Sequence, residues 1–408
     1  MKLGIKNFRS VQDQEIDLGR ITVLYGPNGA GKSSLLYALL TLKNVFLNPT
    51  QNSSSFFGYG FVNLGGFDSV VFDHRARNQI ELALKDEFPC SIGAHDGRSS
   101  LVLKAGIRKD SGVLSLSAGV TGVFPEVDLT LDVPFPYPGN QQAQQSVGIG
   151  ESSYTVTWNG VRAQVQAPST EVEIRKTAED IAVLFDDPVH TLSSISFVPL
   201  KRGFSKFQYS SVPMSPGAVT EDEVATLLST NKILVSRVSH YFERILEREF
   251  RVNVTPGTAV FTLDSTDKTT GVSSELVNDG FGANQIVYVL AKCLGEDVRW
   301  VCLEEPEIHL HPTAIRNFAR AVVDISREED KRFVISTHSE FLLTALLVLV
   351  EKGELQADDL ACYFARKDKK VTSFERQTVN QNGQIEGGLT SFIEAELEDL
   401  KSLQKVTS

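Results

Sequence analysis

Residues 26–33 read Gly26-Pro27-Asn28-Gly29-Ala30-Gly31-Lys32-Ser33, which fits the pattern G-x-x-x-x-G-K-[ST] of phosphate-binding loops. Glycines let the backbone turn tightly so that successive N–H groups point at phosphates, and a helix that follows adds the positive end of its dipole. An apolar run over 21–25 precedes the loop and a leucine-rich segment follows it, so the loop lies between a predicted strand and a predicted helix. The sequence therefore predicts an ATP site. Its expected contacts are Asn28, Gly29, Ala30, Gly31, Lys32, Ser33 and Ser34.

Two residues of this loop have distinct expected roles. Lys32 would reach the β- and γ-phosphates, and the hydroxyl of Ser33 would ligate Mg²⁺. ATP and Mg²⁺ are therefore the expected cofactors.

A pair of acids ends an apolar segment further along the chain, in Trp300-Val301-Cys302-Leu303-Glu304-Glu305-Pro306. A parallel sheet presents groups to a ligand at the carboxyl ends of its strands. Glu304 is expected to help hold Mg²⁺, and Glu305 to orient or deprotonate the attacking water. Such acids also start helices, but behind a phosphate loop the metal interpretation is favoured.

A histidine ends the next predicted strand, in Val334-Ile335-Ser336-Thr337-His338-Ser339. A lone histidine is often structural, but one strand after an acid pair His338 is expected to sense the γ-phosphate.

Two glycines precede an apolar helix in Asn278-Asp279-Gly280-Phe281-Gly282-Ala283-Asn284-Gln285. They suit a simple turn and helix cap, or an anion site at a helix N-terminus. A chain with a phosphate loop does not need a second anion site for the same nucleotide. Asp279, Gly280 and Gly282 are therefore expected to meet the nucleotide of another subunit.

The rest of the chain predicts an α/β fold with a β-rich part. Segments over 283–294, 312–327 and 340–351 suit helices and alternate with strands over 299–303 and 332–336, which predicts a parallel sheet flanked by helices. Residues 81–189 show short alternating runs typical of an antiparallel β-rich lobe, with 134–150 as a surface connection. The expected ATPase head is discontinuous, 1–80 and 190–408, and includes one long amphipathic helix over 219–250.

Length, charge and composition argue against several other classes of protein. With 408 residues and a net charge of −11, a uniformly basic nucleic-acid surface is disfavoured. Lys201, Arg202 and Lys206, interleaved with Phe204 and Phe207, form either a local basic patch or a solvated loop. The four cysteines have no metal-like spacing, and neither a signal core nor an apolar run of membrane-spanning length occurs. A cytoplasmic protein without membrane contact is expected.

The order of the four elements resembles that of ABC-type ATPase heads: phosphate loop, signature motif, acid pair, switch histidine. The chain looks like the branch that contains SMC-like, RecF-like and OLD-family ATPases, and most of all like stand-alone OLD-related "AAA" ATPases of prokaryotes. The most specific match is the acid-pair block over 304–312. Other matches are Asn7-Phe8-Arg9-Ser10, the segment 64–72, and Gly383-Gln384-Ile385 followed by Phe392 and Glu394.

This resemblance implies a head-to-tail homodimer in which Gly280 and Gly282 of one head cover ATP on the phosphate loop of the other. It implies hydrolysis through Glu305 and a switch that acts on a separate protein effector, in phage defence or DNA repair. A RecF-like, nucleotide-gated DNA clamp is the alternative, and an interaction module with a dead nucleotide site is disfavoured because every catalytic position is filled. OLD nucleases continue into a TOPRIM domain, and this chain ends 70 residues after His338, so intrinsic nuclease activity is not expected.

Three departures from the family pattern leave roles open. The first acid is Glu304 where many relatives have Asp. The signature lacks the transporter-like Ser-Gly-Gly, and the usual γ-phosphate-sensing glutamine has no obvious counterpart here.

Overall fold

The computed structural model describes residues 1–215 and 219–386, and these form two compact units. Unit 1 comprises 1–18, 33–195 and 367–373, and unit 2 comprises 19–32, 196–366 and the chain from 374 onward. Phe392 and Glu394, part of the resemblance at the C-terminal end, lie outside the described residues. The segments that carry Lys32, the acid pair and His338 all belong to unit 2.

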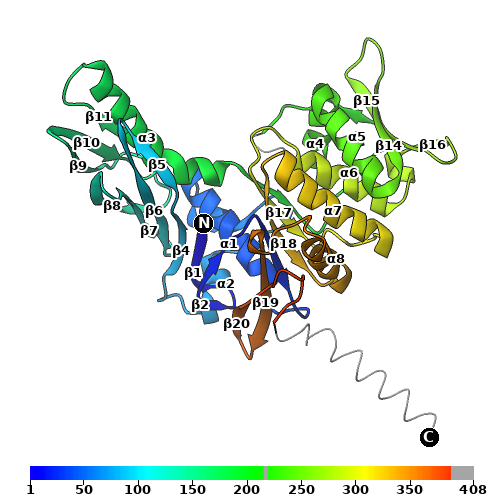
Figure 1. The fold of residues 1–408 in the computed structure, drawn as a ribbon, viewed down its shortest axis with the longest axis horizontal. Helices are drawn as coiled ribbons and strands as arrows, with labels where there is room; N and C mark the ends of the chain where they lie inside the picture. Colours follow the sequence, from blue (N-terminus) through cyan, green and yellow to red (C-terminus); the bar gives the residue numbers. More distant parts are fainter. Residues whose placement is uncertain (216–218, 387–408) are drawn as a thin grey trace, which may run out of the picture. The chain divides into compact units, whose positions relative to one another are not determined.

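Unit 2 is built on a six-stranded sheet (Figure 1). Its strand order is β12 (Ile195–Val198), β17 (Trp300–Glu304), β18 (Arg332–Thr337), β3 (Ile21–Tyr25), β19 (Leu360–Asp368) and β20 (Val371–Gln377). The four strands from β17 to β19 run parallel, and β3 and β17 are buried along their whole length, as strands covered on both faces must be. Helices α6 (Phe281–Cys293), α7 (Pro312–Glu328) and α8 (Glu340–Glu351) contribute to the same hydrophobic core. The predicted parallel sheet with flanking helices is confirmed.

The single helix expected over 219–250 is wrong. The chain forms α4 (Glu221–Thr230) and α5 (Lys232–Leu246) instead. The break falls at Asn231, which has extended backbone angles and whose side chain accepts a hydrogen bond from the Leu234 N–H. Asparagine is among the best N-cap residues because it satisfies such an unpaired donor. A small sheet of β13 (Tyr209–Ser210), β15 (Val260–Asp267), β14 (Arg248–Val254) and β16 (Ser273–Glu275) accompanies these helices.

Unit 1 is mainly antiparallel β-structure, as predicted. Its large sheet has the order β2 (Val11–Asp17), β1 (Lys2–Phe8), β4 (Ile80–Asp86), β6 (His95–Ile107), β7 (Ser111–Val120) and β8 (Phe124–Pro134), with β5 (Pro89–Ile92) paired to β6. A second sheet has the order β11 (Ala163–Gln166), β10 (Ser152–Trp158), β9 (Ala143–Ile149). Side chains of β8 alternate between buried and exposed, which is the pattern of a half-buried strand.

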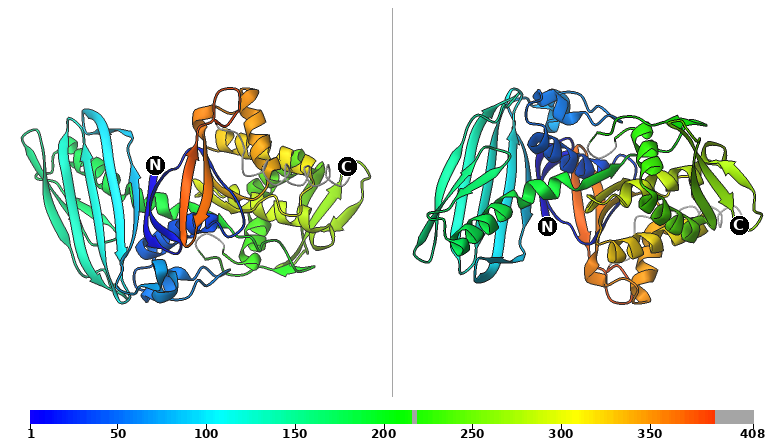
Figure 2. Two further views of the ribbon diagram at one scale, coloured as in Figure 1. Left: turned by 90° about the horizontal axis from the view of Figure 1, so that it is seen from below. Right: turned by 90° about the horizontal axis from the view of Figure 1, so that it is seen from above.

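Two features of unit 1 differ from the prediction. The connection expected over 134–150 contains β9, and residues 172–193 form the helix α3 (Val172–Ser193), which packs on strands of both sheets (Figure 2). Helix α1 (Lys32–Leu47) is the helix predicted after the phosphate loop, and it buries Leu35, Leu36 and Leu39 of the leucine-rich segment. The remaining short elements are η1 (Ser53–Phe57), α2 (Phe67–Val70), η2 (Phe72–His74), η3 (Leu276–Asn278) and η4 (Ala357–Asp359).

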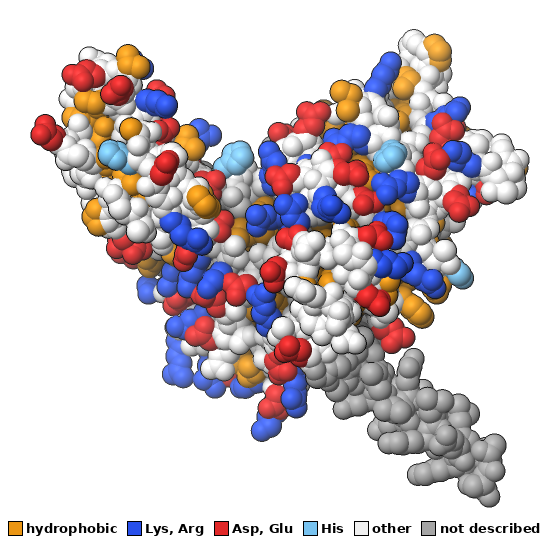
Figure 3. Space-filling model, in the orientation of Figure 1, with side chains coloured by type: hydrophobic (Ala, Val, Ile, Leu, Met, Phe, Trp, Pro, Cys, Tyr) orange, Lys and Arg blue, Asp and Glu red, His pale blue; other side chains and the backbone are white. Residues whose placement is uncertain are grey.

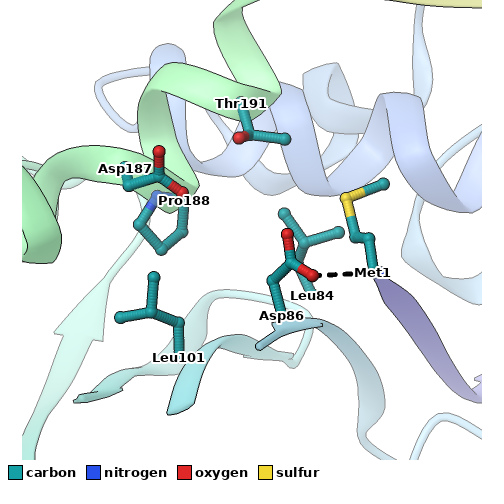
Figure 4. A pocket seen from close by; sticks show the side chains of 7 residues that line it. All are labelled: Met1, Leu84, Asp86, Leu101, Asp187, Pro188 and Thr191. Atoms are coloured by element: carbon teal, nitrogen blue, oxygen red, sulfur yellow. Dashed lines mark ion pairs between the residues drawn. The ribbon is translucent and has the colours of Figure 1, made fainter. Parts of the chain in front are cut away.

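A small hollow in unit 1 lies beside the first residue (Figure 4). The Met1 amino group lies 3.1 Å from a carboxylate oxygen of Asp86. Burial, reinforced by the negative charge of Asp86, raises the pKa of Asp187 on α3. The lining is otherwise mainly apolar, so this hollow has the character of a packing feature and not of a substrate pocket. Among the described helices, none has the length and apolarity that a membrane crossing needs.

Candidate functional site

The phosphate loop joins β3 to α1 through glycines with positive φ. Gly26, Gly29 and Gly31 have φ values of 139°, 75° and 95°, a region that side chains with a Cβ rarely adopt. Pro27, Asn28 and Gly29 are exposed, whereas a Cβ at Gly26 would overlap the carbonyl oxygen of Ala365 on β19. The loop therefore presents its backbone to solvent while its base packs closely on the sheet.

Lys32 is buried and turned back onto its own loop. Its side-chain amine lies 2.8 Å from the Gly26 carbonyl oxygen, 3.1 Å from that of Pro27 and 3.0 Å from Nδ1 of His338. Burial lowers the pKa of Lys32 to about 8, although the negative charges of Glu305 and Glu307 oppose this shift. A buried amine needs acceptor atoms, and the two loop carbonyl oxygens are its backbone partners here.

The acid pair lies at the carboxyl end of β17. Glu304 is buried at the last strand position, and Glu305 is half-buried with a φ of 45°. The backbone N–H of Glu305 donates to the carbonyl oxygen of Ser336 at 2.8 Å, which ties this turn to β18. The left-handed turn at Glu305 lets the chain leave the strand sharply, and strained positions of this kind occur often at functional sites.

Arg202 holds the backbone of this turn through hydrogen bonds. Its guanidinium donates to the backbone carbonyls of Glu304 and Glu305, each at 2.7 Å, and to that of Pro199 at 3.0 Å. Burial lowers the pKa of Arg202 to about 10, against the opposing charges of Glu307, Glu304 and Glu305. The sequence predicted a patch or a loop for this residue and gave no sign of this role. Its position shortly after β12, a strand that was not predicted, is the signal that could have found it.

The other members of that segment do not form an open basic patch. Lys206 forms an ion pair with Asp222, and its ammonium lies over the ring of Tyr209. Phe204 is buried, whereas Phe207 is 56% exposed. Neither the basic patch nor the solvated loop describes the segment, because its arginine belongs to the acid-pair turn.

His338 connects the phosphate loop to the acid pair. Its Nε2 lies 2.7 Å from Oε1 of Glu305, and its Nδ1 faces Lys32. Nδ1 also lies 3.1 Å from the Gly26 carbonyl oxygen. A carboxylate can only accept, so Nε2 carries a proton and donates it to Glu305. Lys32, Glu305 and His338, predicted from three separate motifs, thus form one chain of contacts.

The signature segment, residues 278–285, lies at the N-terminus of α6. The contacts described below join it to Arg248 and His309. The Asp279 carboxylate is mostly buried and pairs with Arg248 at 2.5 Å, so it faces inward. Gly280 is exposed with a φ of 82°, and Phe281 is 74% exposed with its ring 5.4 Å from that of His309. The exposed surface at this helix end is therefore formed by Gly280 and Phe281.

Gly282 permits close packing between α6 and the segment after the acid pair. A Cβ at this position would lie 2.8 Å from the carbonyl oxygen of His309, a backbone atom that cannot move freely. We expect Gly282→Ala to lower the free energy of unfolding by about 1–3 kcal/mol through overpacking, measured by denaturant unfolding. Gly148→Ala is the matched control because a Cβ there has no neighbour within 4 Å, and it should change stability by less than about 0.5 kcal/mol. Equal effects of the two substitutions would contradict this packing role.

Comparisons with known proteins agree with this arrangement. A family model described as "AAA domain" matches residues 2–87, and one described as "AAA domain, putative AbiEii toxin, Type IV TA system" matches residues 199–344. The OLD nuclease of Thermus scotoductus (strain ATCC 700910 / SA-01) is 21% identical over 404 residues, which covers 94% of this chain and 68% of that protein.

Solved structures similar to this chain include SMC heads. The SMC head domain from Thermotoga maritima has a TM-score of 0.43 at 12% identity and covers 92% of this chain and 97% of its own. An SMC head bound to the C-winged helix domain of ScpA has a TM-score of 0.49 at 12% identity, covering 93% of this chain and 98% of its own.

The parallel sheet, with the phosphate loop, the acid pair and the histidine at the ends of its strands, has the fold of an ABC-type P-loop ATPase head. The chain is similar to the OLD nuclease along nearly its whole length, and two of its segments match AAA-domain models.

Proposed function

We propose that this protein binds and hydrolyses ATP and that two copies close head to tail around the nucleotide. The observation that carries the proposal is the convergence of Lys32, His338 and Glu305 within unit 2, with successive side-chain distances of 3.0 and 2.7 Å. A phosphate-binding amine, a histidine and a carboxylate at the ends of adjacent parallel strands form the constellation that phosphoryl transfer to water needs.

The residues present fit a magnesium nucleotide. The exposed backbone over 27–29 and the buried amine of Lys32 suit phosphate oxygens. Within the described ranges, no group of three or more His, Cys, Asp or Glu side chains could hold a metal ion without help. Mg²⁺ commonly takes one or two protein oxygens and completes its shell with phosphates and water. We assign the protein oxygens to Ser33 and Glu304.

The roles of the side chains follow from their contacts. Lys32 has to release the carbonyl oxygens of Gly26 and Pro27 in order to face phosphates. His338 holds Glu305 through its Nε2–H, and the Glu305 carboxylate accepts the proton of the attacking water. When bound, ATP with Mg²⁺ supplies the transferable phosphoryl group. Lys32 then neutralises part of the negative charge of the phosphates.

The paired arrangement is supported by the exposed end of α6. A Cβ added at Gly280 would have no neighbouring atom within 4 Å, and Phe281 is largely solvent-exposed within its own chain. A large exposed aromatic side chain beside a free helix N-terminus is suited to contact a second molecule. The proposed second copy places Gly280 and Gly282 over the nucleotide held by its mate.

We expect Phe281→Ser to weaken ATP-dependent dimerisation by about 2 kcal/mol or more, as for an interface hot spot, without loss of monomer stability. Sedimentation velocity with ATP and Mg²⁺ measures this. Ile233→Ser is the control because Ile233 is 67% exposed on α5, and it should dimerise normally. Dimerisation of Phe281→Ser at wild-type concentrations would show that this helix end lies outside the interface.

A separate protein effector, and a role in phage defence, belong to the proposal through the resemblance to OLD-related ATPases. The RecF-like DNA clamp receives no support from Arg202 and Lys206. Arg202 donates to the Glu304 carbonyl, and Lys206 forms an ion pair with Asp222. Basic and acidic side chains are also interspersed on the face of unit 2 shown in Figure 3. Stimulation of ATP hydrolysis by duplex DNA, compared with stimulation by a protein encoded beside this one, distinguishes the two functions.

A further inference from the structure

A third acid follows the acid pair and has contacts of its own. Oε1 of Glu307 accepts a hydrogen bond from the Thr337 hydroxyl at 2.5 Å and one from the backbone N–H of His338 at 3.2 Å. The Thr337 oxygen in turn accepts from the Ser339 N–H at 2.9 Å. One carboxylate oxygen therefore organises three consecutive residues at the end of β18.

The burial of this carboxylate is costly. Glu307 is 8% exposed, and its Oε2 is buried without a hydrogen-bond partner in the described structure. Burying a charged or polar group without full compensation destabilises a fold. The acceptor oxygen is nevertheless used, because Oε1 accepts two hydrogen bonds from the end of β18.

The two segments that Glu307 joins carry the residues of the site. Glu307 lies two residues after Glu305, and its acceptor oxygen holds the backbone of His338. A second tie, from the Glu305 N–H to the Ser336 carbonyl, connects the same two segments. Together these contacts tie the backbones that carry the Glu305 carboxylate and the His338 ring, which lie 2.7 Å apart.

We propose that Glu307 is a positioning residue that clamps the turn after β17 to the turn after β18 and so keeps His338 in contact with Glu305 and Lys32. This inference rests on the proposed ATPase function. Productive geometry at a reacting centre is sensitive to displacements of about 1 Å, and the backbone of His338 has no comparable side-chain anchor among its described contacts.

The test compares Glu307→Ala, which removes the acceptor, with Glu307→Gln, which keeps an acceptor oxygen but removes the charge. We expect Glu307→Ala to lower kcat by about 10- to 100-fold with KM for ATP changed less than about threefold. Glu307→Gln should recover most of kcat. Thr337→Val removes one hydrogen bond of the clamp and should give an intermediate loss. Glu351→Ala, an exposed acid at the end of α8, is the control and should behave like the wild type.

A second measurement uses the full-length protein without nucleotide. Nitrogen-15 NMR of labelled histidine, with the signal assigned through a His338→Gln variant, should report a proton on Nε2, the atom that faces Glu305, in the wild type and in Glu307→Gln. In Glu307→Ala the tautomer signal of His338 should shift toward a mixture.

The outcomes separate the inference from the function on which it rests. Wild-type kcat and an unchanged His338 signal in Glu307→Ala would overturn the inference, as would equal losses in Glu307→Ala and Glu307→Gln. If Glu307→Ala does not fold, Thr337→Val and Glu307→Gln decide by the same criteria. A wild-type protein without ATPase activity would refute the proposed function, whereas the nucleotide-free NMR comparison would still decide whether Glu307 positions His338.

Discussion

Lys32→Ala should abolish measurable ATP binding and reduce kcat/KM by at least about 100-fold. The amine is the buried cation of the phosphate loop, and its present partners are two loop carbonyl oxygens and His338. In a site shielded from water, a cation facing phosphate oxygens contributes more than in bulk solvent. Isothermal titration calorimetry with ATP and Mg²⁺, followed by steady-state phosphate release, gives both quantities.

The control for this substitution is Lys352→Ala, because Lys352 is an exposed lysine at the C-terminal end of α8. It should bind and hydrolyse ATP as the wild type does. Circular dichroism should show that both variants are folded. Wild-type ATP affinity in a folded Lys32→Ala protein would contradict the placement of the nucleotide on this loop.

The central constellation could be predicted from sequence because its parts are encoded locally. The phosphate loop needs glycines at fixed spacing. Glu305 and His338 each directly follow an apolar strand, and because β17 and β18 are parallel neighbours their carboxyl ends meet at one edge of the sheet. The order of motifs along the chain was therefore sufficient to bring these residues together.

Other features depend on contacts that sequence pattern does not record. Arg202 donates to the carbonyls of Glu304 and Glu305, which lie about a hundred residues further along the chain. Every residue has a backbone carbonyl, so the sequence does not indicate which carbonyls an arginine will contact. The break at Asn231 was not predicted because the apolar period of α4 continues into α5. This continuous period outweighed the N-cap preference of a single asparagine. Helix α3 was missed because its charged and apolar residues follow a long run of strand-like segments, and Pro188 inside it argues against a helix.

The contacts of Lys32 also say what nucleotide binding must change. In the described structure His338 contacts both the Lys32 amine and the Glu305 carboxylate, so these two groups are linked through one ring. Movement of Lys32 toward phosphates would remove one partner of that ring and leave the Gly26 carbonyl oxygen and Glu305. We therefore expect His338 to respond to nucleotide on the phosphate loop, which is the γ-phosphate-sensing role that the sequence predicts for it.

Glu305→Gln should keep ATP binding, lower kcat by about 100-fold or more, and accumulate a dimer in the presence of ATP and Mg²⁺. Glutamine has nearly the same shape as glutamate and keeps an oxygen that accepts from Nε2–H of His338, so the local structure should persist. It lacks the carboxylate that accepts a proton from water, so the nucleotide-closed state should form but turn over slowly. Light scattering after size exclusion should report twice the 44.8 kDa mass of one chain.

Two further variants make this result specific. Glu351→Gln, an exposed acid on α8, should hydrolyse ATP normally and show no trapped dimer. Combining Glu305→Gln with Phe281→Ser should restore the mass of a single chain, because slow turnover traps a dimer only if the end of α6 can contact its mate. A Glu305→Gln protein that binds ATP tightly yet remains at 44.8 kDa would exclude the paired arrangement and leave a nucleotide-binding head that works alone.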